Sequence, residues 1–204
     1  MKVVGITGGT GAGKTTLLNY FETLGARIID CDAVYHDLLE NSDEMKNELE
    51  LRFPGIIKEG RIDRKELGNV VFNDTEALSD LNEITHKFVG NEVQQILNRE
   101  KNDGREIVAI DAILLIESGI ANLCNRVAGI IAPKEKRLKR IMQRDKIDEK
   151  YALARICAQK PDSFFIDNCD IILENDFDDV DDFYSTCAES MERLLKDISK
   201  EEEY

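Results

Sequence analysis

The chain of 204 residues is long enough for one compact α/β domain with small insertions, but too short for two large domains. Apolar residues make up 42% and charged residues 33%, as in ordinary water-soluble proteins, and no apolar run approaches the length of a membrane span. The formal net charge of −14 argues against a general nucleic-acid-binding protein.

The first predicted element is a buried strand over residues 2–7, which leads directly into a glycine-rich segment. That segment matches G-x-x-x-x-G-K-[ST] over residues 8–15 and precedes a helix predicted over residues 14–23. Such a P-loop points backbone N–H groups inward as an anion nest, and the helix dipole adds to their field. Lys14 supplies a charge for the outer phosphates and Thr15 a hydroxyl ligand for Mg²⁺. The segment therefore predicts a nucleoside triphosphate site, rather than a glycine-rich turn that happens to precede a helix.

A second strand is predicted over residues 27–30, after Gly25 ends the first helix. Alternating strands and helices indicate a parallel sheet with crossover helices. Asp30-Cys31-Asp32 then lies at the carboxyl end of a strand, where ligands of open α/β sheets collect. Asp32 either takes part in the site or caps a helix that begins at Ala33, and the two roles are compatible.

Residues 33–103 are predicted to be mostly helical, which is too much chain for a simple crossover. Capping boxes are predicted at Asn41 with Glu44 and at Asp63 with Glu66. A break at residues 73–74 separates these from helices predicted over residues 76–84 and 85–102. We expect an inserted helical subdomain that holds a second substrate over the P-loop.

A third strand over residues 105–111 ends in Asp111, as a Walker B strand does, although many buried strands also end in aspartate. The apolar run continues to Glu117, which either orients a second substrate or forms a salt bridge. A fourth strand is predicted over residues 126–132, and Pro133 is expected at the first position of the next helix.

The segment 134–160 carries a net charge of about +6 in a strongly acidic chain, whereas residues 174–204 carry about −9 and read as a solvated helix face. In the basic segment Arg137, Arg140 and Arg144 recur on one helical face. They indicate a lid that closes on phosphates, with surface ion pairs as the alternative. A second lid helix is expected from Asp148 to Gln159, before a break at Lys160-Pro161.

A fifth strand over residues 169–173 is followed by Asn175, whose amide suits an adenine edge but is equally typical of a turn. Residues 177–200 contain the closing helix, whose predicted core face is Phe183, Cys187, Met191 and Leu194. The chain has five cysteines and no C-x-x-C pair, so we expect neither a zinc site nor a disulfide framework. With no signal peptide ahead of the P-loop, we expect a cytoplasmic protein.

In this order the motifs resemble those of the dephospho-coenzyme A kinases over nearly the whole chain. The resemblance rests on residues 5–16, 24–26, 29–33, 53–54, 81–82, 86, 114–117, 140–145, 158–159 and 170–175. The P-loop alone indicates only a nucleotide site. The Asp-x-Asp, Leu-Leu-x-Glu, arginine-rich lid and terminal asparagine together are far more specific.

The resemblance implies a P-loop kinase fold, a three-layer parallel five-stranded sheet with a helical insert and a lid. It implies transfer of the ATP γ-phosphate to the ribose 3′-hydroxyl of dephospho-coenzyme A, the last step of coenzyme A synthesis, with Mg²⁺. The expected parts are a core of residues 1–32, 104–133 and 166–204, a substrate-binding insert of residues 33–103, and a lid of residues 134–165. We expect a monomer or a small homo-oligomer without nucleic-acid or membrane partners.

By the same resemblance Asp32 is the general base, and Lys14 and Arg140 carry transition-state charge. The ATP-binding set is Gly8, Gly9, Gly11, Ala12, Gly13, Lys14, Thr15, Thr16, Arg144 and Asn175, with Thr15 also the metal ligand. The acceptor-binding set is Thr7, Asp32, His86, Leu115 and Glu117. Two alternatives stay open: another small P-loop kinase for a nucleoside or nucleotide, and a nucleotide-binding module without transfer activity.

Overall fold

The computed structural model describes residues 1–72 and 74–201 of the chain. This part of the chain divides into two compact units. We call residues 1–29 and 100–201 the sheet unit, and residues 30–99 the helical unit. Each unit has its own hydrophobic core and is described by itself.

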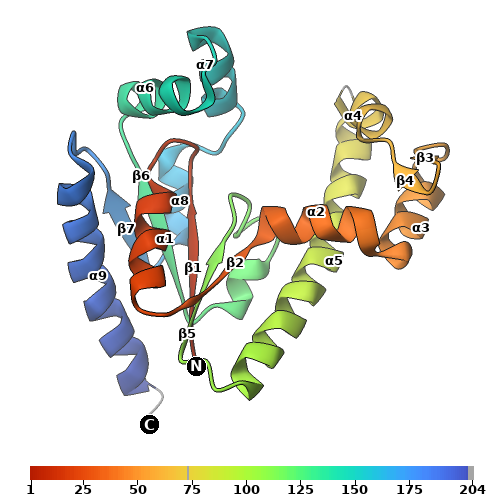
Figure 1. The fold of residues 1–204 in the computed structure, drawn as a ribbon. Coiled ribbons are helices and arrows are strands. Elements are labelled where there is room, and N and C mark those ends of the chain that lie inside the picture. The colour runs from red at the N-terminus through yellow and green to blue at the C-terminus, as the bar shows by residue number, and fades with distance from the viewer. Residues whose placement is uncertain (73, 202–204) are drawn as a thin grey trace. The chain divides into compact units, whose positions relative to one another are not determined.

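The sheet unit is built on five strands, in the order β2-β5-β1-β6-β7 (Figure 1). Their bounds are β1 Lys2–Gly8, β2 Arg27–Asp30, β5 Ile107–Asp111, β6 Arg126–Ile131 and β7 Ile171–Glu174. Strand β1 pairs in parallel with β5 and β6, and β6 pairs in parallel with β7, which confirms the predicted parallel sheet. The central strand β1 therefore delivers the P-loop to the middle of the carboxyl edge.

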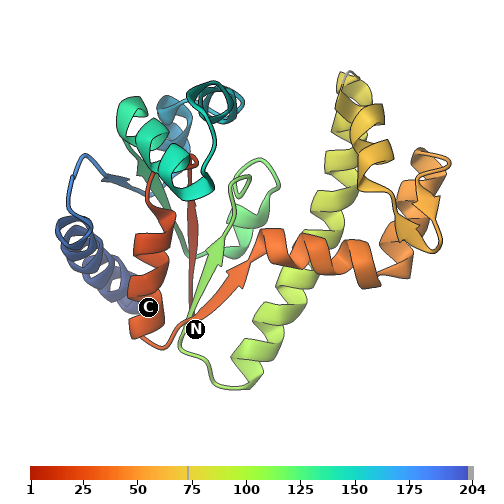
Figure 2. The same cartoon turned by 45° about the horizontal axis from the view of Figure 1, so that its top comes forward.

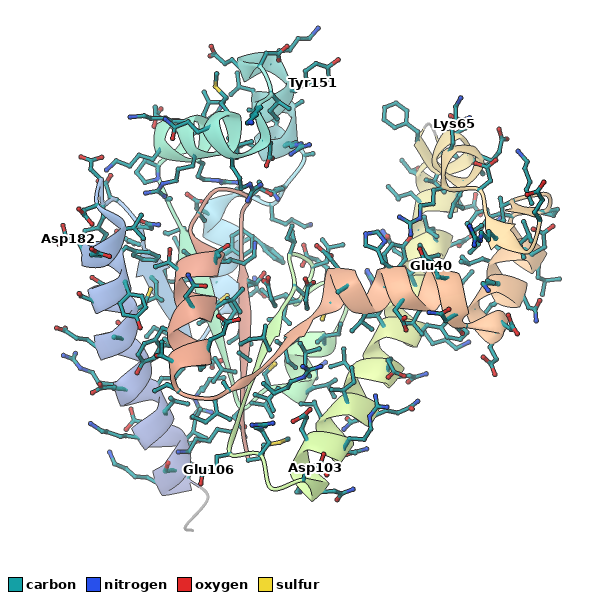
Figure 3. The ribbon with its side chains drawn as sticks, in the orientation of Figure 1. Glu40, Lys65, Asp103, Glu106, Tyr151 and Asp182 are labelled. Atoms are coloured by element: carbon teal, nitrogen blue, oxygen red, sulfur yellow. The ribbon has the colours of Figure 1, made fainter. Side chains whose placement is uncertain are left out.

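Helices cover both faces of this sheet. Helices α1 (Lys14–Thr23) and α9 (Val180–Glu201) lie side by side on one face, where they share the core with alternate residues of β1 and β6. Helix α8 (Asp162–Asn168) packs on β6, β7 and β1 behind the sheet (Figure 1). Phe183, Cys187 and Met191 of α9 are buried as predicted. Leu194 is partly buried against the same core, as predicted, and its neighbour Leu195 is buried more deeply. The acidic residues of this helix, such as Asp182, lie on its exposed side (Figure 3).

Two further helices, α6 (Lys134–Asp145) and α7 (Glu149–Cys157), pack side by side around Ile141, Ala152 and Ile156 (Figure 2). Pro133 is the N-cap of α6 and not its first helical residue as predicted. Helix α7 ends at Cys157, two residues before the predicted end at Gln159. Pro161 is the N-cap of α8, a helix that the sequence analysis did not predict. A short 3₁₀ helix, η1 (Ile120–Leu123), precedes β6.

The helical unit contains α2 (Cys31–Asn41), α3 (Asp43–Arg52), a hairpin of β3 (Ile57–Lys58) and β4 (Arg61–Ile62), α4 (Arg64–Phe72) and most of α5 (Thr75–Asn102). Their apolar faces form a separate core around Met45, Leu49 and Ile56. Charged residues such as Glu40 and Lys65 lie on the surface of this unit (Figure 3). The two-stranded hairpin was not predicted.

The predicted helix starts in this unit need three corrections. Asp30, not Asp32, caps α2, because the helix begins directly after strand β2 and the Asp30 carboxylate accepts the N–H groups of Asp32 and Ala33 at 2.9 and 3.1 Å. Ser42, not Asn41, caps α3 through the Met45 N–H. The predicted helices 76–84 and 85–102 are one helix, α5, because no glycine or proline stands at their junction.

Other predicted helix boundaries are confirmed. Asp63 accepts the N–H groups of Lys65 and Glu66 at the start of α4. Asp74 caps α5 through Glu76 and Ala77, whereas Asn73, the other residue of the predicted break, lies outside the described residues. All five cysteines lie in the described part of the chain and are free thiols. No helix among the described residues is long and apolar enough to cross a membrane.

Candidate active site

The P-loop connects β1 to α1 in a fixed conformation. Lys14 reaches back across the loop and donates from Nζ to the Gly8 carbonyl at 3.0 Å. Inside the loop the Ala12 N–H donates to the Gly9 carbonyl at 3.0 Å. These two bonds occupy the Gly8 and Gly9 carbonyls, and α1 begins directly after the loop. Backbone N–H groups of such a loop and of a helix N-terminus suit an anion.

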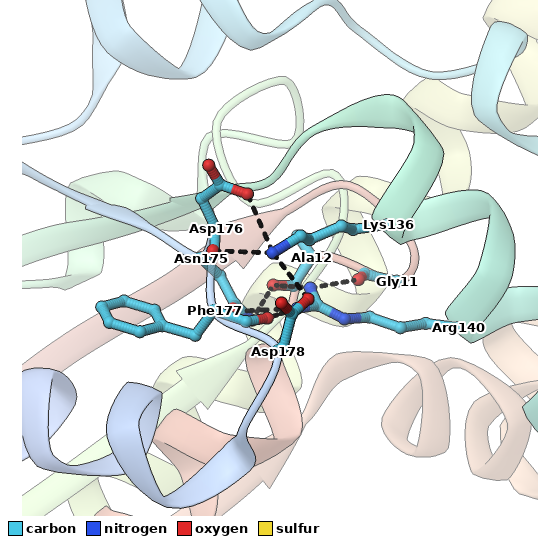
Figure 4. Close-up of polar contacts among 8 residues, drawn as sticks. All are labelled: Gly11, Ala12, Lys136, Arg140, Asn175, Asp176, Phe177 and Asp178. Atoms are coloured by element: carbon cyan, nitrogen blue, oxygen red, sulfur yellow. Dashed lines mark hydrogen bonds and ion pairs between the residues drawn. The ribbon is translucent and has the colours of Figure 1, made fainter.

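A cluster around Arg140 and Asn175 holds the second half of the P-loop (Figure 4). Arg140 donates from Nη1 to the Gly11 carbonyl at 3.3 Å and from Nη2 to the Asn175 Oδ1 at 3.1 Å. Asn175 is only 5% exposed, and its Nδ2 donates to the Ala12 carbonyl at 2.7 Å. Both ends of the Asn175 amide are thus engaged with the protein. Burial lowers the pKa of Arg140 somewhat, against the opposing effect of Asp178.

The loop after β7 is attached to α6 by a further cation. Lys136 donates to the Asp176 carbonyl at 2.7 Å and pairs with the carboxylates of Asp176 and Asp178 at 3.0 and 2.9 Å (Figure 4). This contact raises the pKa of Lys136, and the Lys136 hydrogen bond lowers the pKa of Asp178. The loop that carries Asn175 is therefore tied to α6 on the C-terminal side of the asparagine.

The three arginines predicted on one face of α6 make different contacts. Arg137 is buried against the loop at Thr10, and Arg140 lies against Gly11 and Ala12. Arg144, at the end of the helix, pairs with Asp145 at 2.8 Å, and its side chain is 59% exposed. Two of the three arginines therefore contact the P-loop through its carbonyl oxygens.

The other predicted site residues of the sheet unit lie at or after the carboxyl ends of β1 and β5. Thr7 is buried and donates from its hydroxyl to the Ile113 carbonyl at 3.1 Å, while Leu115 is fully buried. Glu117 is exposed and lines a pocket of about 280 Å³ together with Ile113, Leu114, Ala158, Gln159, Lys160, Pro161 and Phe165. Asp111 ends β5 opposite Ile6 of β1, two residues before the P-loop.

Two predicted residues belong to the helical unit. Asp32 is exposed in the first turn of α2, and His86 lies half-buried on α5. The described residues contain no group of three or more His, Cys, Asp or Glu side chains that would hold a metal ion. Thr15 is exposed in the first turn of α1 beside Lys14, which suits an ion that keeps most of its water ligands.

Sequence reasoning missed Gln159 and Arg137 as a pair that contacts Thr10, and it missed the contact of Asn175 with Ala12. The spacing of Arg137 on α6 indicated a shared arginine face. Helical periodicity alone, however, does not show which arginine of that face packs against the P-loop. For Asn175, the sequence showed only that it follows a strand, which does not predict its hydrogen bond to the Ala12 carbonyl.

Comparison with known proteins gives a consistent result. The family model described as dephospho-CoA kinase matches residues 2–181. A dephospho-CoA kinase of Dehalococcoides mccartyi is 38% identical over 182 residues, which cover 86% of this chain and 89% of that protein.

Two solved structures match almost the whole chain. A dephospho-CoA kinase from Campylobacter jejuni is 30% identical, covers 96% of this chain and 98% of its own, and has a TM-score of 0.68. The Thermus thermophilus protein TT1252 is 28% identical, with coverages of 96% and 97% and a TM-score of 0.77. The predicted P-loop kinase fold is thereby confirmed, and the chain belongs to the dephospho-CoA kinase family.

Proposed function

We propose that this chain transfers the γ-phosphate of ATP to the ribose 3′-hydroxyl of dephospho-coenzyme A, giving coenzyme A and ADP. The observation that carries the proposal is a preformed P-loop, tied by Lys14 and Arg140, in a chain whose residues 2–181 match the family model. Phosphoryl transfer leaves little covalent work to a protein, so positioning and charge supply most of the acceleration.

ATP is held by the loop residues 8–16, whose backbone N–H groups and Lys14 face the phosphates. Arg140 places a positive charge beside the loop, where it stabilises charge that develops during transfer. Arg144 has an exposed guanidinium within the lid segment, and we assign it a contact to the nucleotide. Thr15 would hold Mg²⁺ through its hydroxyl, and the ion would supply positive charge at the outer phosphates.

We assign the acceptor to the insert of residues 33–103, with direct contacts from His86 and Glu117. Thr7 and Leu115 are fully buried and would support the site from beneath rather than contact the acceptor. Asp32 accepts a hydrogen bond from the acceptor hydroxyl and takes its proton late in the transfer. The exposure of Asp32, together with the capping of α2 by Asp30, leaves the Asp32 carboxylate accessible to a substrate. The lid of residues 134–165 excludes water, since an open site would hydrolyse ATP. We infer a cytoplasmic enzyme that acts as a monomer or a small homo-oligomer.

The test is a coupled ADP-release assay with a panel of acceptors: dephospho-coenzyme A, adenosine, AMP and uridine. Lys14→Ala serves as the control for contaminating kinases. ADP release that depends on dephospho-coenzyme A alone supports the proposal. Release that depends on another acceptor identifies a different small kinase, and ATP binding without acceptor-dependent release identifies a nucleotide-binding module.

A further inference from the structure

Every polar group of Thr10, at the outer turn of the P-loop, is held by the segment that follows β6. The Thr10 N–H donates to the Gln159 Oε1 at 2.8 Å, and the Thr10 hydroxyl accepts from the Gln159 Nε2 at 2.8 Å. The Thr10 carbonyl accepts from the Arg137 Nε at 3.0 Å. One glutamine therefore binds both the backbone and the side chain of the same loop residue.

Arg137 connects this glutamine to α6 and α8. Its side chain is buried, with Nη2 donating to the Gln159 Oε1 at 2.8 Å and Nη1 lying 3.6 Å from the Asp162 carboxylate. A guanidinium buried at this depth needs such partners, because an unpaired buried charge is costly. Thr10, Arg137 and Gln159 form one closed network of hydrogen bonds.

The loop sequence leaves room for this network at Gly9. A Cβ at that position would lie 2.2 Å from the Arg137 Nη2 and 2.5 Å from its Cζ. Gly9 is therefore required for the close approach of Arg137, in addition to any need for conformational freedom. The contact is separate from the Arg140–Asn175 cluster, which holds Gly11 and Ala12.

We propose that Gln159 and Arg137 are positioning residues that fix the outer turn of the P-loop for ATP. They hold the Thr10 carbonyl away from the phosphate side, so that the turn need not reorganise when the anion binds. Without Gln159 the turn exchanges among conformations, and ATP binding has to select one of them. This inference rests on the proposed function only in taking ATP as the ligand of the loop.

The test is a double-mutant cycle on Thr10 and Gln159. Gln159→Leu removes both polar atoms of the side chain at similar volume. Thr10→Val removes only the hydroxyl, whereas Thr10→Ser keeps the hydroxyl and removes the methyl group. Gln143→Leu, at an exposed glutamine of α6, is the matched control. Binding of a non-hydrolysable ATP analogue is measured by calorimetry, alongside KM for ATP, KM for dephospho-coenzyme A and the melting temperature.

We expect Gln159→Leu to weaken binding of the analogue by about tenfold, because it removes both hydrogen bonds to Thr10 and the bond from Arg137. Thr10→Val, which removes only the bond between the Thr10 hydroxyl and the Gln159 Nε2, should weaken it by about threefold. The double variant should bind no more weakly than Gln159→Leu, while Thr10→Ser and Gln143→Leu stay near wild type. KM for ATP should rise while KM for dephospho-coenzyme A stays constant.

The proposal would be overturned if the two substitutions weakened analogue binding independently, so that the double variant lost the product of the two single effects. It would also be overturned if Gln159→Leu lowered the melting temperature but left the analogue affinity unchanged. The calorimetric measurement needs no acceptor. If dephospho-coenzyme A proves not to be phosphorylated, the proposed function fails while the cycle still decides the roles of Gln159 and Thr10.

Discussion

Gly13→Ala is expected to damage both stability and nucleotide binding, because Gly13 has a φ of 120° and lies against Asn175. A Cβ there would lie 2.3 Å from the Asn175 Nδ2 and 3.0 Å from the Phe183 Cε1. Asn175 cannot move aside freely, since it is buried and bonded to both Ala12 and Arg140. The substitution therefore breaks the contacts that hold the second half of the loop.

The loss of folding stability expected for Gly13→Ala can be estimated from these contacts. Backbone strain at a positive φ costs about 1–3 kcal/mol, and the two hydrogen bonds of Asn175 are worth about 0.5–1.5 kcal/mol each. The sum, about 2–6 kcal/mol, is a large part of the stability of a typical domain. Gly90→Ala is the matched control, because Gly90 lies within α5 with nothing within 4 Å of the added Cβ. Alanine should stabilise that helix by about 0.5–1 kcal/mol.

Urea unfolding followed by circular dichroism measures both variants, and calorimetry with a non-hydrolysable ATP analogue measures binding. We expect the unfolding midpoint to fall for Gly13→Ala and to rise slightly for Gly90→Ala, with weakened binding only in the former. A Gly13→Ala protein with wild-type midpoint and affinity would refute the packing argument.

Three further outcomes are expected. Lys14→Ala should abolish phosphoryl transfer in the ADP-release assay, whereas Asp32→Asn should lower kcat by about 10²–10⁴ with nucleotide affinity kept; near wild-type turnover would exclude Asp32 as the base. Lys136 lowers the pKa of Asp178, so their contact stabilises the protein at neutral pH and is lost as the pH falls through that lowered value. The difference in melting temperature between wild type and Asp178→Asn should therefore shrink in acid, and a constant difference would contradict this. Iodoacetamide at pH 8 should modify Cys157 first, since it alone of the five thiols is exposed; mass mapping that finds another cysteine modified first would count against the described packing.

The strands and the P-loop were predictable because their signals are local. Apolar runs such as residues 2–7 and 126–132 have few alternatives to buried strands, and the G-x-x-x-x-G-K-[ST] pattern fixes the loop between strand and helix. The core face of α9 followed from 3.6-residue periodicity, although Leu194 is only partly buried and the deeper position is Leu195.

The failures occurred where the decisive contact is distant in sequence or the element is very short. Helix α8 has only seven residues after Pro161, and the β3–β4 hairpin turns at Glu59-Gly60 between two-residue strands. Elements this short contain too few residues for a helical or strand periodicity of apolar positions to be recognised. The inward direction of Arg137 depends on Thr10 and Gln159, which lie far from it along the chain, so no local pattern reveals it.

The position of the transferred phosphate tests the central claim most directly. The purified chain is incubated with ATP, Mg²⁺ and dephospho-coenzyme A, and the product is identified by chromatography, mass spectrometry and phosphorus NMR, with Lys14→Ala run in parallel. We predict stoichiometric ADP and a product that matches coenzyme A with its phosphate on the ribose 3′-oxygen, absent from the Lys14→Ala reaction. ADP without coenzyme A, or a phosphate on another hydroxyl, would contradict the account.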